Sequence, residues 1–114
     1  MMTSAKFSQL LAKAASEKKA WKVVRIKLAG KADFADYFVI AEGDTDIQLR
    51  AIAENILDQA AEVGEKPLRV DGLEEGTWVL IDFVRVVVHL LLPGERTYYD
   101  LEGLWGDRPI MPVG

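Results

Sequence analysis

The sequence predicts a single α/β (α+β) domain in which a mixed five-stranded sheet is flanked by helices. Two segments, residues 5–19 and 46–63, carry apolar residues at the three-and-four spacing of amphipathic helices. Short runs rich in β-branched residues lie between and after these segments, as expected for strands. A chain of 114 residues, half of them apolar, is long enough to bury one core.

The first elements can be placed in order along the chain. Ser4 can cap a helix that runs from Ala5 to about Lys19. Residues 21–28 alternate between apolar and charged side chains, which predicts a strand with one wet face. A loop then leads to a short apolar strand at residues 37–41.

A sharp turn joins this strand to a second helix, predicted from about Asp46 to Val63. Thr45 and Gln48 have the spacing of a capping box, with Asp44 as a competing cap. Gly64 ends the helix. Residues 68–71 form a third strand, which completes a β-α-β unit, and such units give parallel strands.

The last third of the chain predicts two neighbouring buried strands. Residues 79–92 are a branched apolar run, interrupted only at Asp82 and at Val84-Arg85. Tight hairpins need residues that tolerate positive φ, and Val84 is poorly suited to that. We therefore expect a longer or bulged connection, or strain at Val84. Residues 96–104 predict a short helix or turn.

These elements place one domain at residues 1–106 and a flexible tail at residues 107–114. The chain has no cysteine, which excludes disulfides, thiolate catalysis and the common zinc sites. The longest apolar run is far below the ~20 residues that span a membrane. We expect a cytoplasmic protein without membrane contact.

Charge is segregated along the chain, whose net charge is −4. Residues 1–35 hold eight Lys/Arg against two acids, a net charge of +6. Residues 36–114 hold six Lys/Arg against sixteen acids, a net charge of −10. An acidic main body argues against gripping DNA or another bare phosphate backbone, and favours a basic protein partner.

The candidate catalytic groups do not assemble into a site. His89, the only histidine, lies inside an apolar strand, and all serines lie in the N-terminal helix. We therefore expect a hydrogen-bonded structural histidine, with a polar surface contact as the alternative. Asp44 and Asp46 could be a metal-binding pair, but at a helix start they are better caps and would repel a triphosphate. We expect no catalytic residue, metal, cofactor or small-molecule substrate.

Large amphipathic rings flank the two C-terminal strands, as they do in protein-binding surfaces. They are Trp78, Tyr98, Tyr99 and Trp105. The absence of a reaction centre and the presence of these rings together favour a binding function.

Several motifs, taken in order over roughly residues 5–105, resemble the ribosomal silencing factor family (RsfS, also called Iojap). They are Ala35-Asp-Tyr-Phe-Val-Ile-Ala, Gly43, the helix of residues 48–56, Gly76-x-Trp-Val-Leu-Ile-Asp, Val86-Val-Val-His and Tyr99-Asp-Leu-Glu-x-Leu-Trp. The combination is specific. The resemblance implies a degenerate nucleotidyltransferase fold without catalytic activity.

The resemblance also implies a partner. The family binds the large ribosomal subunit through its fourteenth protein, which is basic, on the face that meets the small subunit. Its bulk blocks subunit joining and lowers translation when nutrients are scarce, and members often self-associate, which implies a possible homodimer. On this basis Trp78 is the expected anchor. The expected partner-binding residues are Trp78, Asp82, His89, Tyr98, Tyr99 and Asp100, and Leu101 and Trp105 are expected to pack the last helix down.

This chain departs from the family in two places. The family commonly has Gly-Thr-Ser after the second strand, where this chain has Gly43-Asp44-Thr45. It usually has Gly-Asp in the last hairpin, where Val84-Arg85 puts a base in place of an acid beside the expected interface. Two alternatives stay open: a dimeric adaptor for another basic protein, and a minimal nucleotidyltransferase using Asp44, Asp46 or Asp82.

Overall fold

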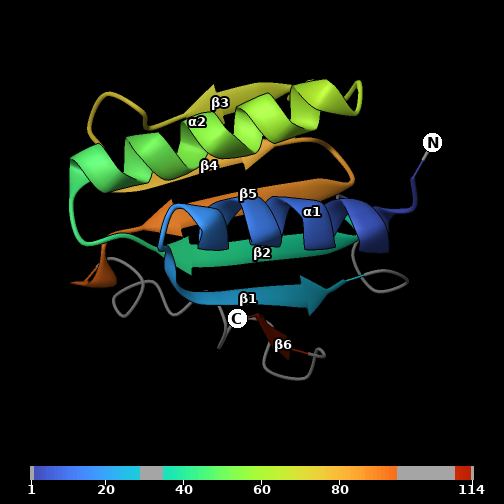
Figure 1. Cartoon of the computed structure of the whole chain (residues 1–114), viewed down its shortest axis with the longest axis horizontal. Coiled ribbons are helices and arrows are strands. Elements are labelled where there is room, and N and C mark those ends of the chain that lie inside the picture. Colours follow the sequence, from blue (N-terminus) through green and yellow to red (C-terminus); the bar gives the residue numbers. More distant parts are fainter. Residues whose placement is uncertain (1, 29–34, 95–109, 114) are drawn as a thin grey trace.

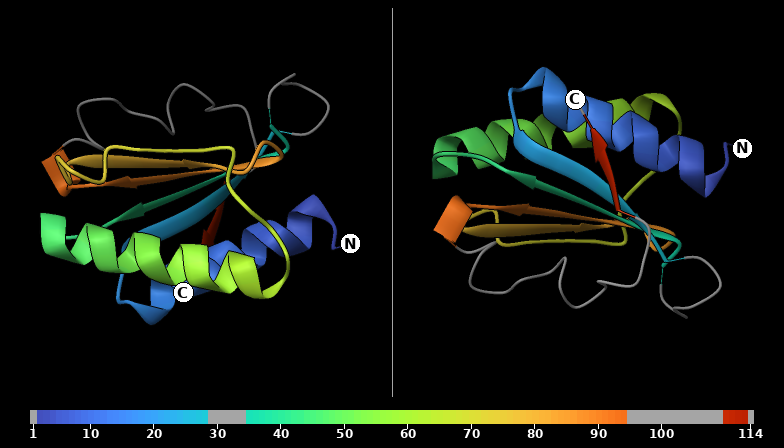
Figure 2. Two further views of the ribbon diagram at one scale, coloured as in Figure 1. Left: turned by 90° about the horizontal axis from the view of Figure 1, so that it is seen from above. Right: turned by 90° about the horizontal axis from the view of Figure 1, so that it is seen from below.

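A computed structural model describes residues 2–28, 35–94 and 110–113. They form one mixed sheet with two helices packed side by side on one of its faces (Figures 1 and 2). The strand order is β3-β4-β5-β2-β1-β6. The elements are α1 (Ser4–Glu17), β1 (Trp21–Lys27), β2 (Tyr37–Glu42), α2 (Asp46–Glu62), β3 (Arg69–Asp71), β4 (Trp78–Asp82), β5 (Val86–Leu91) and β6 (Ile110–Val113).

The predicted fold class and the five predicted strands are confirmed. The strands β2 and β5 pair in parallel, and every other neighbouring pair is antiparallel. It follows that β2 and β3 are parallel, as their β-α-β connection predicts. They are not neighbours, however, because β5 and β4 lie between them.

A sixth strand corrects the expectation of a flexible tail. Residues 110–113 form β6, which pairs antiparallel with residues 23–26 of β1 at one edge of the sheet. The sequence did not predict this strand because it contains Pro112. Proline interrupts a central strand but is tolerated in an edge strand. The predicted helix or turn at 96–104 and positions 107–109 lie outside the described residues.

Each face of the sheet carries its own apolar cluster. Between helices and sheet, the stripes of the two helices meet side chains of every central strand. This cluster includes Phe7, Leu11, Ile52, Ile56, Val39, Val88 and Leu90. The face opposite α1 and α2 carries a second cluster that includes Val24, Ile26, Phe38, Ile40, Val87 and Leu91. Strands buried on both faces read as near-continuous apolar runs, which explains why β2 and β5 are apolar apart from Glu42 and His89.

The N-cap of α2 is the one predicted from the sequence, whereas the N-cap of α1 is a different residue. The Thr45 hydroxyl accepts the N–H of Gln48 at 3.1 Å, as predicted. The Gln48 side chain reaches back to the N–H of Asp44, one residue earlier than in a standard capping box. For α1 the cap is Thr3 rather than Ser4, whose hydroxyl donates instead to the Asp36 carboxylate at 2.7 Å.

The turn between β4 and β5 carries the strain that the sequence predicts. Val84 has a φ of 75°, and the N–H of Arg85 donates to the carbonyl of Phe83 at 3.0 Å. An i+2 to i hydrogen bond around a residue at this φ is a γ-turn, which is rare and strained. The Asp82 carboxylate partly offsets the cost by accepting the N–H of Val84 at 2.7 Å.

Candidate partner-binding surface

Two of the predicted site residues, Trp78 and His89, are brought together on the face of the sheet opposite α1 and α2. His89 in β5 lies opposite Leu80 in β4, so Trp78 is its diagonal neighbour on the same face. The indole Nε1–H of Trp78 donates to Nδ1 of His89 at 3.2 Å. The two ring centroids are 5.9 Å apart. This bond fixes the orientation of a partly buried tryptophan.

His89 is a neutral imidazole in this setting. Its side chain is 6% exposed, and burial lowers its pKa from 6.5 to about 4. The edge-to-face ring of Phe38, 4.8 Å away, adds to its apolar surroundings. Because Nδ1 accepts from Trp78, the proton sits on Nε2, which has no hydrogen-bond partner in the described part of the chain. The predicted hydrogen-bonded structural histidine agrees with this geometry.

Asp82, a third predicted site residue, lies on the same face but at the other end of β4. Four residues separate it from Trp78, which is about 13 Å along a strand. Its carboxylate accepts a backbone N–H in the Val84 turn, so it has a structural role there. A hollow of about 300 Å³ lies beside His89. It is lined by Phe38, Arg69, Leu80, Asp82, Val87 and His89.

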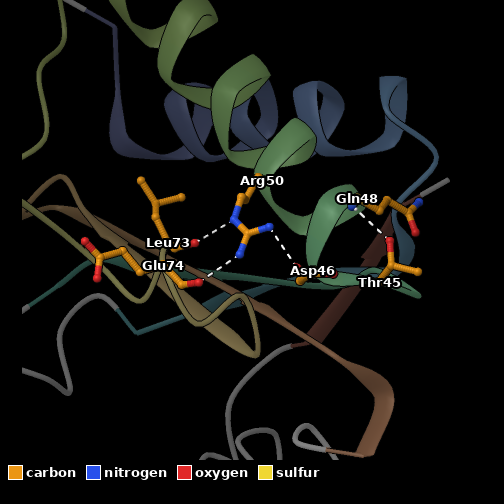
Figure 3. A network of polar contacts seen from close by, with 6 residues as sticks. All are labelled: Thr45, Asp46, Gln48, Arg50, Leu73 and Glu74. Atoms are coloured by element: carbon orange, nitrogen blue, oxygen red, sulfur yellow. Dashed lines mark hydrogen bonds and ion pairs between the residues drawn. The ribbon is translucent and has the colours of Figure 1, made fainter.

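The loop that precedes Trp78 is held by a residue that sequence reasoning missed. The Arg50 guanidinium on α2 donates to the carbonyls of Leu73 and Glu74, each at 2.8 Å, and to the Asp46 carboxylate at 2.8 Å (Figure 3). This contact with Arg50 lowers the pKa of Asp46. The four-residue spacing of the ion pair could have been found in the sequence. The two carbonyl contacts, 23 and 24 residues away, could not.

Two glycines let this loop approach its neighbours closely. Gly72 has a φ of 86°, and a Cβ there would lie 2.0 Å from the Trp78 carbonyl oxygen. Gly76 has a φ of 69°, and a Cβ there would lie 2.5 Å from the Asp46 Cβ. The resulting loop exposes Glu74 and Glu75, and Glu75 lines a hollow together with Trp78. A hollow of about 410 Å³ here is lined by Asp71, Gly72, Glu75, Thr77, Trp78 and Leu80.

The remaining predicted site residues, Tyr98, Tyr99 and Asp100, lie outside the described residues, as do Leu101 and Trp105. The described part of the surface is therefore an aromatic anchor at the start of β4, bordered by a rigid acidic loop. Such a surface can bind a basic partner, since amphipathic rings and carboxylates complement cationic side chains.

Comparisons with known proteins identify the relatives of this chain. Residues 2–113 match the family model described as RsfS, ribosomal silencing factor during starvation. A ribosomal silencing factor of Bacillus subtilis is 42% identical over 102 residues, covering 90% of this chain and 86% of its own length. The chain belongs to the ribosomal silencing factor family.

Other similarities extend to structure and to more distant relatives. A crystal structure of a Chromobacterium violaceum protein superposes with a TM-score of 0.89 at 32% identity, covering 99% of this chain and 95% of its own. A mouse relative, named mitochondrial assembly of ribosomal large subunit protein 1, is 29% identical over 83 residues, covering 70% of this chain and 36% of its own length. The family resemblance drawn from the sequence motifs is confirmed.

Arg85, in the hairpin where this chain has Val84-Arg85 in place of the family's usual Gly-Asp, has a structural role. The guanidinium of Arg85 donates to the Met2 carbonyl at 2.7 Å and to the Glu65 carboxylate at 3.1 Å, and lies 4.9 Å from the ring of Phe7. It therefore points to the helix side of the sheet. The turn also lies at the opposite end of β4 from Trp78. The expected placement of this base beside the interface stays a prediction, and in the structure the base lies far from Trp78 along β4.

The family relatives carry names that describe a regulatory role. Within residues 2–28 and 35–94, no three His, Asp or Glu side chains are grouped so that they could hold a metal ion. Neither of the two helices that the structure describes is long and apolar enough to cross a membrane.

Proposed function

We propose that this protein binds the large ribosomal subunit on the face that meets the small subunit, through the fourteenth protein of the large-subunit series. Bound there, it sterically blocks joining of the small subunit and represses translation when nutrients are limited. Family membership supports this proposal. The name of the mouse relative supports the choice of the large subunit. The work would take place in the cytoplasm, where joined ribosomes form.

The observation that carries the proposal is the fixed Trp78 beside its acidic loop. Binding hot spots are enriched in tryptophan that fills a pocket on the partner. His89 already restrains the indole, so less side-chain entropy is lost on binding. Arg50 likewise holds the loop that presents Glu74 and Glu75 before any partner arrives. A basic ribosomal protein complements this arrangement in charge.

The proposed mechanism is occupancy alone. The domain measures 34 × 32 × 25 Å along its principal axes, so its bulk on the subunit surface would exclude a second subunit from the same place. No bond is made or broken, and the effect depends on concentration relative to the dissociation constant. A monomer is enough for this mechanism, and a homodimer would only add bulk.

Sedimentation in sucrose gradients tests the proposal. Purified protein is added to dissociated large and small subunits under conditions that allow them to join. We expect it to co-sediment with large subunits and to reduce the joined-ribosome peak as its concentration rises. Subunits that join equally well at every concentration would contradict the proposal.

Calorimetry tests the nucleotidyltransferase alternative. A titration of the protein with magnesium and ATP should give no binding heat. A saturable heat would revive the role of Asp44, Asp46 or Asp82 as a catalytic acid, and Asp→Asn variants at each position would then identify the ligand.

A further inference from the structure

An exposed tryptophan, Trp21, lies at the same end of the sheet as the partly buried Trp78. Trp21 begins β1 and is 56% exposed. Strand register places Trp21 and Trp78 in one row across the sheet. Trp21 pairs with Glu42, Glu42 with Leu91, and Leu91 with Trp78. Three strand spacings separate the two tryptophans, about 14 Å. Both rings therefore lie at one end of the sheet, where α2 begins and β5 ends (Figure 1).

The Trp21 ring is held by hydrogen bonds between two turns. Its Nε1–H donates to the Asp44 carboxylate at 3.2 Å. The Gln48 side-chain amide donates to the carbonyls of Lys18 and Lys19, at 3.4 and 3.1 Å. The turn from α1 into β1 is thus tied to the turn from β2 into α2. An exposed tryptophan that is fixed in this way is a ready contact surface.

The backbone around Trp21 is strained on both sides. Lys19 has a φ of 63° and Lys22 a φ of 47°, although neither is glycine. The register of β1 against β2 also shifts between Trp21 and Val24, which marks a bulge. Left-handed non-glycine residues and bulges concentrate at functional sites, where they re-aim side chains. Here they set Trp21 outward and place lysines before and after it.

Three exposed lysines lie around Trp21, against one exposed carboxylate, Asp44, that contacts its ring, so this surface is more basic than the Trp78 loop. Lys18, Lys19 and Lys22 are all exposed. An aromatic ring interleaved with lysines is the arrangement by which proteins bind RNA, since bases stack on the ring and lysines neutralise phosphates. The acidic loop beside Trp78 suits a basic protein instead. A boundary between a ribosomal protein and ribosomal RNA offers both partners side by side.

We infer that Trp21, Lys18 and Lys19 form a second contact surface that binds ribosomal RNA next to the protein bound by Trp78. This inference rests on the proposed function, because it assumes that the chain sits on the large subunit. Trp21 stacks on an unpaired base, and the two lysines contact the phosphate backbone. The row of paired strands between the two tryptophans sets the separation of the two contacts.

Binding to purified large subunits, measured with the full chain over a range of salt concentrations, tests the inference. A Lys18→Gln/Lys19→Asn variant removes two charges, and asparagine tolerates the positive φ at position 19. Each lost phosphate contact should reduce the slope of log affinity against log salt by about 0.7 to 0.9. The matched control is Lys6→Gln/Lys66→Gln, which should keep the wild-type slope. These exposed lysines lie in the first turn of α1 and in the connection from α2 to β3, and both segments are at the other end of the domain (Figure 1).

Trp21 variants test the stacking contact separately. Trp21→Ala should weaken subunit binding about tenfold, whereas Trp21→Phe should recover most of the affinity because phenylalanine also stacks. Thermal melts by circular dichroism accompany each variant. Ultraviolet cross-linking of the wild-type complex should join the Trp21 peptide to RNA.

The same variants are then titrated with the isolated fourteenth large-subunit protein, where no effect is expected. Equal losses with that protein would mean that the surface binds protein and would overturn the inference. Wild-type slope and affinity in the Lys18→Gln/Lys19→Asn variant would overturn it too. A wild-type chain that does not bind large subunits at all would instead remove the proposed function, and this inference with it.

Discussion

Trp78 and His89 share a hydrogen bond that only a neutral imidazole can accept. The indole N–H lies 3.2 Å from Nδ1 of His89, and burial keeps that ring unprotonated by lowering its pKa to about 4. Protonation would place a second N–H opposite the first and break the contact. The orientation of the proposed anchor is therefore linked to the charge of a residue in the next strand.

Stability should depend on pH through His89. The unfolded chain takes up this proton near pH 6.5, whereas the folded chain resists it down to about pH 4. The contribution is therefore complete above about pH 6.5 and is lost as pH falls toward 4, by about 3 kcal/mol in all. Urea unfolding at about pH 7 and about pH 4.5, compared between wild type and His89→Phe, measures it. An equal loss of stability in both proteins would refute this assignment.

Replacing the anchor should weaken the complex without unfolding the domain. Trp78→Ala removes a central aromatic side chain, which typically costs ~2 kcal/mol, or about thirtyfold in affinity for large subunits. Leu68→Ala, at an apolar residue that is 73% exposed, is the matched control and should bind normally. A Trp78→Ala protein that melts like wild type and binds like wild type would refute the site.

The acidic loop should contribute through charge. Glu74→Lys/Glu75→Lys reverses two exposed carboxylates beside Trp78, and should slow association and weaken binding, most strongly at low salt. Glu54→Lys/Asp58→Lys makes the same change of charge on exposed positions of α2. Stopped-flow association with large subunits compares the two variants. Equal rates would show that only overall charge matters.

Arg50 should stabilise the loop rather than contact the partner. Arg50→Gln removes two hydrogen bonds to loop carbonyls, so we expect a loss of about 1–2 kcal/mol in unfolding free energy. The amide of Gly76, which donates to the Gly72 carbonyl, should exchange faster. Asp46→Asn is the control, since it removes the exposed ion pair and leaves both carbonyl bonds. Identical exchange in both variants would contradict this role.

Relieving the strained turn should raise the melting temperature. Val84 is 56% exposed at a φ of 75°, so Val84→Gly loses little packing and relieves strain of about 1–3 kcal/mol. The greater conformational freedom of glycine in the unfolded chain cancels ~0.5–1 kcal/mol of this gain in stability. A net gain of about 1 kcal/mol corresponds to about 4 °C. The control is Val63→Gly, at an exposed valine with a φ of −102°, which should lower the melting temperature.

Local chemistry in the sequence predicts local structure well. The Thr45 cap, the Gly64 helix end and the strain at Val84 were all predictable because each depends on residues within a few positions. The choice of Thr3 rather than Ser4 as the N-cap of α1 was not predictable, because the Ser4 hydroxyl bonds to Asp36, 32 residues away.

The candidate surface shows the same limit. Trp78 and His89 are marked by their residue types and their motifs, but their hydrogen bond follows from strand register, which no local pattern gives. The contacts of Arg50 with the loop and of Trp21 with Asp44 escaped sequence reasoning because each joins residues that are 23 or more positions apart. The strand β6 depends on pairing with β1, at the far end of the chain.

The position of β5 has a consequence for how the chain is made. It lies between β2 and β4, and its parallel pairing with β2 joins residues 37–42 to residues 86–91. A nascent chain that ends before Val86 holds α1, α2 and the strands β1 to β4, but lacks the strand that joins the two halves of the sheet. Cooperative folding must therefore wait until most of the polypeptide has been synthesised, and a chain stalled earlier would expose the apolar edges of β2 and β4 to chaperones and proteases.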